Sequence, residues 1–136
     1  MVAAGISIEN IVAVTGVLLP FEARAILRSS YFVVTQRMHG AISSLQAGVP
    51  ALSLSYSNSN KFSGIIGSYL GLTELVVEIR KAHFGEDIDK VYSAIDRGLQ
   101  DATGLKAKIE KAVIKAKRDA MVQIEDLAKD IISQLD

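Results

Sequence analysis

The sequence predicts an α/β fold in which helices cover both faces of a parallel sheet. Over residues 11–80, short apolar segments alternate with segments of helical periodicity. The apolar segments are continuous runs, which is typical of parallel strands that crossover helices bury on both faces. From residue 86 onward only helical periodicity remains. We therefore expect a Rossmann-like core over residues 1–80, followed by C-terminal helices over residues 86–136.

Length and composition favour a single domain over residues 1–136. The chain has 136 residues, which is enough for one hydrophobic core and too few for two domains of ordinary size. Its 15 basic side chains balance 15 acidic ones, which argues against a globally cationic nucleic-acid-binding protein. With no cysteine and only two histidines, the chain is expected to hold no disulfide and no metal centre. Any site for an anion must then be local.

The first expected elements are a strand and a helix. Residues 12–18 are mainly apolar, and we predict a strand there. A signal-peptide core is the alternative, but no basic residue precedes this run and Glu9 lies beside it. Pro20 and the apolar spacing after it predict a helix of about ten residues that ends near Ser29. No apolar run reaches the roughly 20 residues of a membrane-spanning helix, so we expect a soluble, cytoplasmic protein.

A second strand, a helix and a third strand follow. Residues 31–35 are aromatic and β-branched, which favours a strand. Helical spacing of apolar residues begins at His39, and Gly48 is a suitable helix terminator. Pro50 holds the residue before it in an extended conformation, which introduces a strand at residues 51–55.

The core is expected to close with one more helix and strand. Residues 56–60 are polar and prone to turns. The apolar spacing over residues 62–70 predicts a short helix that Gly71 ends, and residues 75–79 read as a further strand.

Two apolar stripes of helical period mark the C-terminal region. The first stripe consists of Ile88, Val91, Tyr92, Ile95 and Leu99. The second consists of Leu105, Ile109, Val113, Ala116, Ala120, Ile124, Leu127, Ile131 and Leu135. The second stripe predicts either one helix of about 30 residues, roughly 45 Å long, or a helix that kinks near Gly104 or Arg118 and folds back. A continuous helix outruns this small sheet and would pack on a partner domain or a second copy of the chain, through Ile114, Met121 and Val122.

The candidate site lies at Gln36-Arg37-Met38-His39-Gly40, where the second strand leads into a helix. Side chains just past the carboxyl ends of parallel strands line the crevice that holds ligands in open α/β sheets. The guanidinium of Arg37 matches a phosphate or a carboxylate with two parallel hydrogen bonds, and the amides of the helix N-terminus add positive potential. His39 can donate to the same anion or exchange a proton near neutral pH.

Other polar residues are weaker candidates. Lys61 opens the next helix, where it is either a third cation of the site or an exposed lysine. Tyr56 is expected at the rim, with Ser55, Ser57 and Asn58 as hydrogen-bonding neighbours. His83 has no matching partner in the sequence, and Glu86, Asp87 and Asp89 read as acids that favour a helix N-terminus, not as a metal cluster.

The ordered set Arg37, His39, Gly48, Pro50, Tyr56 and Lys61, between these strands and helices, resembles the C-terminal domain of the polysaccharide pyruvyl transferase family. The return at Leu70-Gly71-Leu72 after the lysine-led helix adds to the resemblance, which covers about residues 11–80. The chain departs from the family pattern in residues 57–60, a slightly long spacer before Lys61.

The resemblance implies half of a two-domain fold of the B-type glycosyltransferase kind. It implies transfer of a pyruvyl group from phosphoenolpyruvate to sugar hydroxyls of a surface polysaccharide, usually as a cyclic ketal. Arg37 and His39 would contact phosphoenolpyruvate, with His39 as the catalytic candidate, either binding the anion or moving a proton. Gly40, Tyr56 and Lys61 complete the expected substrate-binding set. Phosphoenolpyruvate is a substrate, and we expect no cofactor.

On this interpretation the chain is a fragment that lacks an N-terminal, acceptor-binding domain and the opening strand of its own domain. It would bind phosphoenolpyruvate weakly at best and have no transferase activity alone, because catalysis needs groups from both sides of the cleft. Two other functions stay open. The chain could be the donor-binding half of a nucleotide-sugar glycosyltransferase or epimerase, or a non-catalytic module that forms a homodimer through its last helix.

Overall fold

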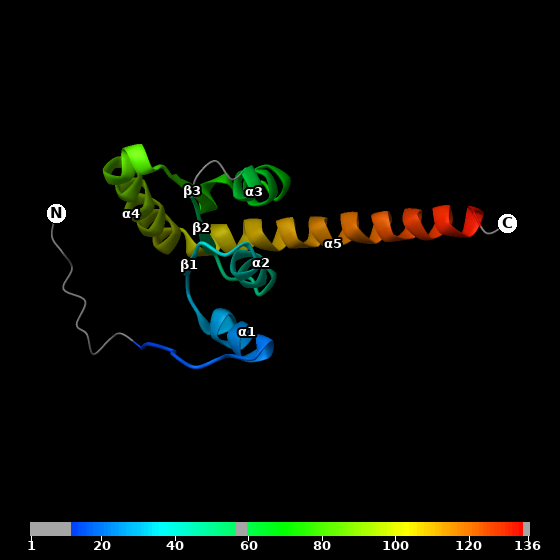
Figure 1. Cartoon of the computed structure of the whole chain (residues 1–136), viewed down its shortest axis with the longest axis horizontal. Helices are drawn as coiled ribbons and strands as arrows, with labels where there is room; N and C mark the ends of the chain where they lie inside the picture. Colours follow the sequence, from blue (N-terminus) through cyan, green and yellow to red (C-terminus); the bar gives the residue numbers. More distant parts are fainter. Residues whose placement is uncertain (1–11, 57–59, 135–136) are drawn as a thin grey trace.

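The computed structural model describes residues 12–56 and 60–134, and a three-stranded parallel sheet lies at its centre (Figure 1). The strands lie side by side in sequence order, as β1 (Val33–Thr35), β2 (Ala51–Tyr56) and β3 (Val76–Ile79). Val33 pairs with Ala51 and Ser53 pairs with Val76, both in parallel register. The three carboxyl ends therefore share one edge of the sheet. The predicted α/β class is confirmed.

Helical segments connect the strands and complete the chain. They are α1 (Pro20–Ser29), α2 (Met38–Gln46), α3 (Asn60–Phe62), the π-helical turn η2 (Ser63–Tyr69), the 3₁₀ turns η3 (Thr73–Leu75) and η4 (Lys81–His83), α4 (Phe84–Gln100) and α5 (Ala102–Ser133). Gly48 and Gly71 end α2 and the α3–η2 segment with φ of 76° and 70°, which favours glycine because it has no Cβ. Both predicted helix ends are confirmed.

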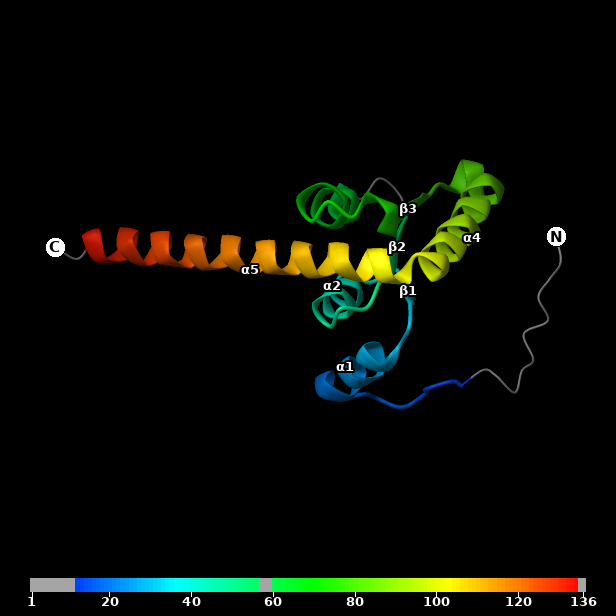
Figure 2. The same ribbon diagram turned by 180° about the vertical axis from the view of Figure 1, so that it is seen from behind.

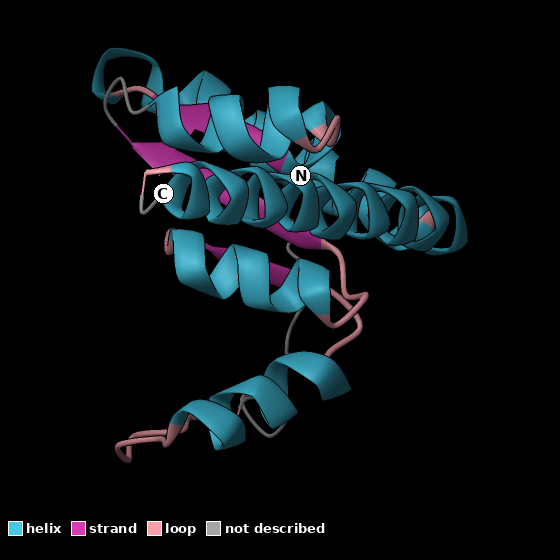
Figure 3. Ribbon diagram, turned by 90° about the vertical axis from the view of Figure 1, so that its right-hand side faces the viewer, coloured by secondary structure: helices cyan, strands magenta, loops and turns pink. Residues whose placement is uncertain are grey.

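Helices cover both faces of the sheet, as the continuous apolar strands predict. On one face, α2, η2 and α5 form a single layer, where Leu45, Ile66 and Ile109 are buried together. Figure 3 shows this layer in front of the strands. On the other face, Leu52 and Val77 point toward Val91 of α4. Neighbouring residues of a strand point to opposite faces, so both faces are apolar.

The expected strand at residues 12–18 is wrong. This segment forms no helix or strand, and Val12 and Val17 are 86% and 99% exposed. It does not pair with β1, whose ladder partner in the described sheet is β2. Without a neighbouring strand, its backbone groups cannot join a ladder, so its apolar and β-branched composition does not suffice to form one.

The last helix is continuous from Ala102 to Ser133, so the predicted alternative of a kinked helix that folds back is wrong. Leu105, Ile109 and Ala112 are buried against the sheet layer, whereas every residue from 120 to 133 is exposed. Figures 1 and 2 show this outer half extending well beyond the rest of the fold. The side chain of Asp101 caps the helix by accepting a hydrogen bond from the backbone N of Gly104 at 3.2 Å.

A buried carboxylate joins the end of β3 to the start of α4. Asp87 lies in the first turn of α4, as expected from the sequence, but its side chain is fully buried. Its Oδ2 accepts from the backbone N of Arg80 at 2.9 Å and from Nε at 3.1 Å, and its Oδ1 accepts from Nη2 at 2.8 Å. Lys90 Nζ donates to Oδ1 at 2.7 Å. These donors, the Arg80 side chain first, hold the pKa of Asp87 well below the ordinary carboxyl value.

We expect Asp87→Asn to lower the Tm by several degrees at pH 7, because it removes a buried acceptor of charged donors. A depressed pKa stabilises the fold above the ordinary carboxyl pKa of about 3.9 and loses this effect as the pH falls further. The difference in Tm between the two proteins should therefore narrow below about pH 4. Thermal unfolding followed by circular dichroism measures this difference in Tm, with the exposed Asp89→Asn as the control. Equal Tm values for the two variants at pH 7 would contradict this role of Asp87.

Candidate functional site

The turn between β1 and α2 carries Arg37 at the carboxyl edge of the sheet. Arg37 is the N-cap residue of α2, with extended backbone, and its side chain is exposed. Its backbone N donates a hydrogen bond to Oγ1 of Thr35 at 3.0 Å. The side chain of Thr35, the last residue of β1, thus fixes the backbone of Arg37, the N-cap residue of α2. Arg37 therefore lies beside the free amides of the first helical turn.

Gly40 allows this turn to be tight. A Cβ at position 40 would lie 3.1 Å from Thr35 Oγ1, closer than an ordinary van der Waals contact. With glycine there, the first turn of α2 packs directly against the end of β1. The close approach gives Gly40 a structural reason, beside the substrate-binding role expected from the resemblance.

His39 follows in the first turn of α2 and lines a hollow of about 590 Å³ between α1 and α2. The other lining residues are Pro20, Phe21, Ala23, Arg24, Leu27, Gly40 and Ser43. Arg37 does not line this hollow, so the structure does not bring the two predicted side chains into one cavity. Both are exposed at the same helix N-terminus. The cation that shares the hollow with His39 is Arg24, whose Nη2 donates to Gln46 Oε1 at 3.2 Å.

Basic residues come after each of the three strands along the chain. Arg37 follows β1, Lys61 opens α3 after β2, and Arg80 follows β3. Lys61 is exposed, and Tyr56 ends β2 with 42% of its surface accessible, consistent with a rim position. Ser55 is buried in β2 and makes polar interactions, whereas the expected neighbours Ser57 and Asn58 lie outside the described residues.

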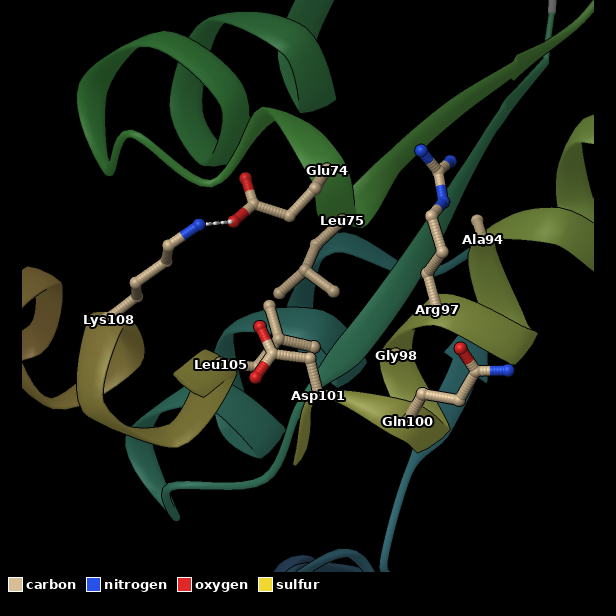
Figure 4. A pocket seen from close by; sticks show the side chains of 9 residues that line it. All are labelled: Glu74, Leu75, Ala94, Arg97, Gly98, Gln100, Asp101, Leu105 and Lys108. Atoms are coloured by element: carbon tan, nitrogen blue, oxygen red, sulfur yellow. Dashed lines mark hydrogen bonds and ion pairs between the residues drawn. The ribbon is translucent and has the colours of Figure 1, made fainter. Parts of the chain in front are cut away.

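A second hollow, of about 490 Å³, lies at the opposite edge of the sheet (Figure 4). It is bounded by η3, just before β3, and by the junction of α4 and α5. Leu75 and Leu105 lie between the charged groups, and Lys108 Nζ donates to Glu74 Oε1 at 2.6 Å. Burial raises the pKa of Glu74, but the Lys108 hydrogen bond, a backbone hydrogen bond and the charge of Lys108 together outweigh burial and leave that pKa below the ordinary value. The two charges thus satisfy each other and fasten α5 to the sheet.

Comparison with known proteins links the first part of the chain to one family. The family model described as polysaccharide pyruvyl transferase matches residues 6–58. This confirms the predicted resemblance for the N-terminal part of the chain, although the match ends before Lys61 and does not extend to residue 80. No curated protein and no solved structure matches the chain. The matched segment includes Arg37, His39, Gly40 and Tyr56.

Two further features concern membrane-spanning helices and clusters of metal-binding side chains. Of the helices in the described part of the chain, none combines the length and apolar character that crossing a membrane requires. Within residues 12–56 and 60–134, no three His, Cys, Asp or Glu side chains gather as they would around a metal ion.

Sequence reasoning missed three residues around the site. Thr35 holds the β1–α2 turn, Arg24 shares a hollow with His39, and Arg80 follows β3 but is committed to Asp87. Thr35 could have been found as a hydroxyl two residues before a helix start, a common local hydrogen-bonding arrangement. Arg24 could not have been found by spacing, because only the packing of α1 on α2 brings it near His39.

We expect Thr35→Val to loosen the turn that presents Arg37, because it removes the acceptor and keeps the side-chain shape. The Arg37 amide should exchange its hydrogen faster, and the fold should lose about 0.5–1 kcal/mol. Hydrogen exchange followed by NMR measures the amide directly. Thr35→Ser keeps the hydroxyl and should preserve the slow exchange; an unchanged exchange rate in Thr35→Val would show that this bond does not order the turn.

Proposed function

We propose that this chain is the donor-binding part of a polysaccharide pyruvyl transferase and binds phosphoenolpyruvate at the β1–α2 turn. The single observation that carries the proposal is that the family match includes Arg37, His39 and Gly40, all at the start of α2 on the carboxyl edge of the sheet. In open parallel sheets this edge is where ligands bind. The exposed side chain of Arg37 adds positive charge at the same edge, whereas Arg80 after β3 is paired with Asp87.

The chemistry of the donor suits these groups. Phosphoenolpyruvate carries a phosphate and a carboxylate, and the planar fork of Arg37 matches either one. The N-terminal amides of α2 favour negative charge at the same point. In the transfer, the donor methylene gains a proton, a sugar hydroxyl oxygen bonds to the adjacent carbon, and phosphate leaves; a second hydroxyl then closes the ketal. His39 either binds the donor or moves the proton to the methylene.

The proposal also covers the binding partners and the cellular compartment. We propose that a sugar of a surface polysaccharide is the acceptor and that a separate N-terminal domain binds it. We propose that the reaction takes place in the cytoplasm. We also propose a second copy of the chain as a partner, because apolar side chains of α5 are exposed.

We expect phosphoenolpyruvate to bind the chain weakly and Arg37→Ala to reduce its affinity about ten-fold, because charged hydrogen bonds contribute roughly 1.5–3 kcal/mol. Isothermal titration calorimetry measures both affinities. Arg97→Ala is the matched control, since Arg97 is also an exposed arginine but lines the hollow at the opposite edge. The Arg97→Ala variant should bind phosphoenolpyruvate with the same affinity as the unchanged chain.

Equal affinities for Arg37→Ala and the unchanged chain would remove Arg37 from the site. Tighter binding of a uridine diphosphate sugar than of phosphoenolpyruvate would instead favour a nucleotide-sugar enzyme. These two outcomes are distinct, because the first concerns one residue and the second concerns the ligand class.

The chain alone should not form a ketal on a sugar acceptor, because half of a cleft cannot align donor and acceptor. Mass spectrometry of the acceptor after incubation with phosphoenolpyruvate tests this. A gain of mass corresponding to a pyruvyl ketal, at a rate comparable to that of a full-length relative, would show that the chain is a complete enzyme.

A further inference from the structure

A basic hollow lies at the C-terminal end of α2, away from the β1–α2 turn. It has a volume of about 430 Å³ and is lined by Arg24, Arg28, Gln46, Ala47 and Lys117. The three cations come from α1 and α5, which are far apart in the sequence, and α2 lies between these two helices (Figures 1 and 2). The fold therefore gathers three positive charges around one hollow, and no acidic residue of the described chain lines it.

Within residues 12–56 and 60–134, none of these three cations forms an ion pair with an acid. The nearest acids along the chain are engaged elsewhere. Glu22 Oε2 accepts from the backbone N of Leu19 at 2.8 Å, and Asp119 Oδ2 accepts from Tyr69 Oη at 3.2 Å. Since the whole chain carries 15 basic and 15 acidic side chains, the excess of positive charge at this hollow is local.

Helix ends account for only part of this arrangement. Arg28 lies in the last turn of α1, where the helix dipole favours a cation, and the C-terminal end of α2 also carries partial negative charge. The carbonyl oxygens of residues 43–45 of α2, however, already accept hydrogen bonds from the backbone N atoms of residues 47–49. They do not need the cations as caps. Arg24 and Arg28 are four residues apart on α1, a spacing at which like charges destabilise a helix.

The side chains of the hollow suit a phosphate group. Arg24 Nη2 donates to Gln46 Oε1 at 3.2 Å, which orients the guanidinium and leaves its other N–H donors for a ligand. Arg28 adds a second planar fork that matches two phosphate oxygens, and Lys117 adds a compact ammonium charge. Because three cations surround one hollow, a group with two or more negative charges satisfies them better than a single carboxylate does.

We propose that this hollow binds a multivalent phosphate, either a free anion or the diphosphate group of a larger molecule, at a site separate from the β1–α2 turn. Arg24 also lines the hollow of His39, but seven residues of α2 separate His39 from Gln46, about 10 Å at 1.5 Å per residue. The two ends of α2 therefore present separate groups of cations. A bound phosphate offsets the repulsion between Arg24 and Arg28 and joins α1 to α5 through Lys117.

Isothermal titration calorimetry with inorganic pyrophosphate, in about 150 mM salt, tests the site. The unchanged chain should bind pyrophosphate, and Arg28→Gln and Lys117→Gln should each weaken binding about ten-fold, because each removes a charged donor to phosphate. Lys111→Gln is the matched control, since Lys111 is also an exposed lysine of α5 but does not line the hollow; it should leave the affinity unchanged. Circular dichroism checks that each variant keeps its helices. No binding of pyrophosphate, or unchanged affinity in Arg28→Gln and Lys117→Gln, overturns the proposal.

Two further titrations separate the two sites and the two sources of the anion. Arg37→Ala should bind pyrophosphate as the unchanged chain does, so a failure of the phosphoenolpyruvate proposal would not affect this result. Loss of pyrophosphate binding in Arg37→Ala, with binding kept in Lys117→Gln, would place the anion at the β1–α2 turn and overturn the second site. Methyl diphosphate that binds as tightly as pyrophosphate indicates the diphosphate group of a larger molecule, and much weaker binding indicates a free anion.

Discussion

The shared direction of three short strands is the constraint on which the candidate site depends. Because β1, β2 and β3 are parallel and in sequence order, every residue that follows a strand lies at the same edge. Arg37, which follows β1, and Tyr56, which ends β2, are brought to one edge by this topology. An antiparallel sheet of the same strands would send one of the two to the opposite edge.

Cations at this edge are held in two different ways. Arg80 gives its donors to the buried Asp87, so its charge is used inside the protein and fixes the start of α4. Among the described residues, Arg37 is held through its backbone, by Thr35 and by the first hydrogen bond of α2, and its side chain is exposed. A guanidinium that is positioned by its main chain while its fork stays available suits a ligand site better than one already paired with a carboxylate.

The sequence predicted those features that depend on local pattern. Gly48 and Gly71 end helices where expected, and the period of 3.6 residues correctly gave one long last helix among its alternatives. The prediction of a strand at residues 12–18 was wrong, because strand pairing depends on a neighbour distant in sequence, which composition does not reveal. The site was predicted only in part: spacing placed Arg37 and His39 at a helix start, but it could not show that Arg24 from α1 borders the hollow of His39.

Helix α2 has only nine residues, and its two ends serve different surfaces. Arg37 caps its N-terminus and His39 lies in its first turn, whereas Ile42, Leu45 and Gln46 border a hollow of about 210 Å³ beside α5. Both surfaces therefore depend on the placement of one short helix, so a substitution of its buried residues Ala41 or Ser44 disturbs both of them at once.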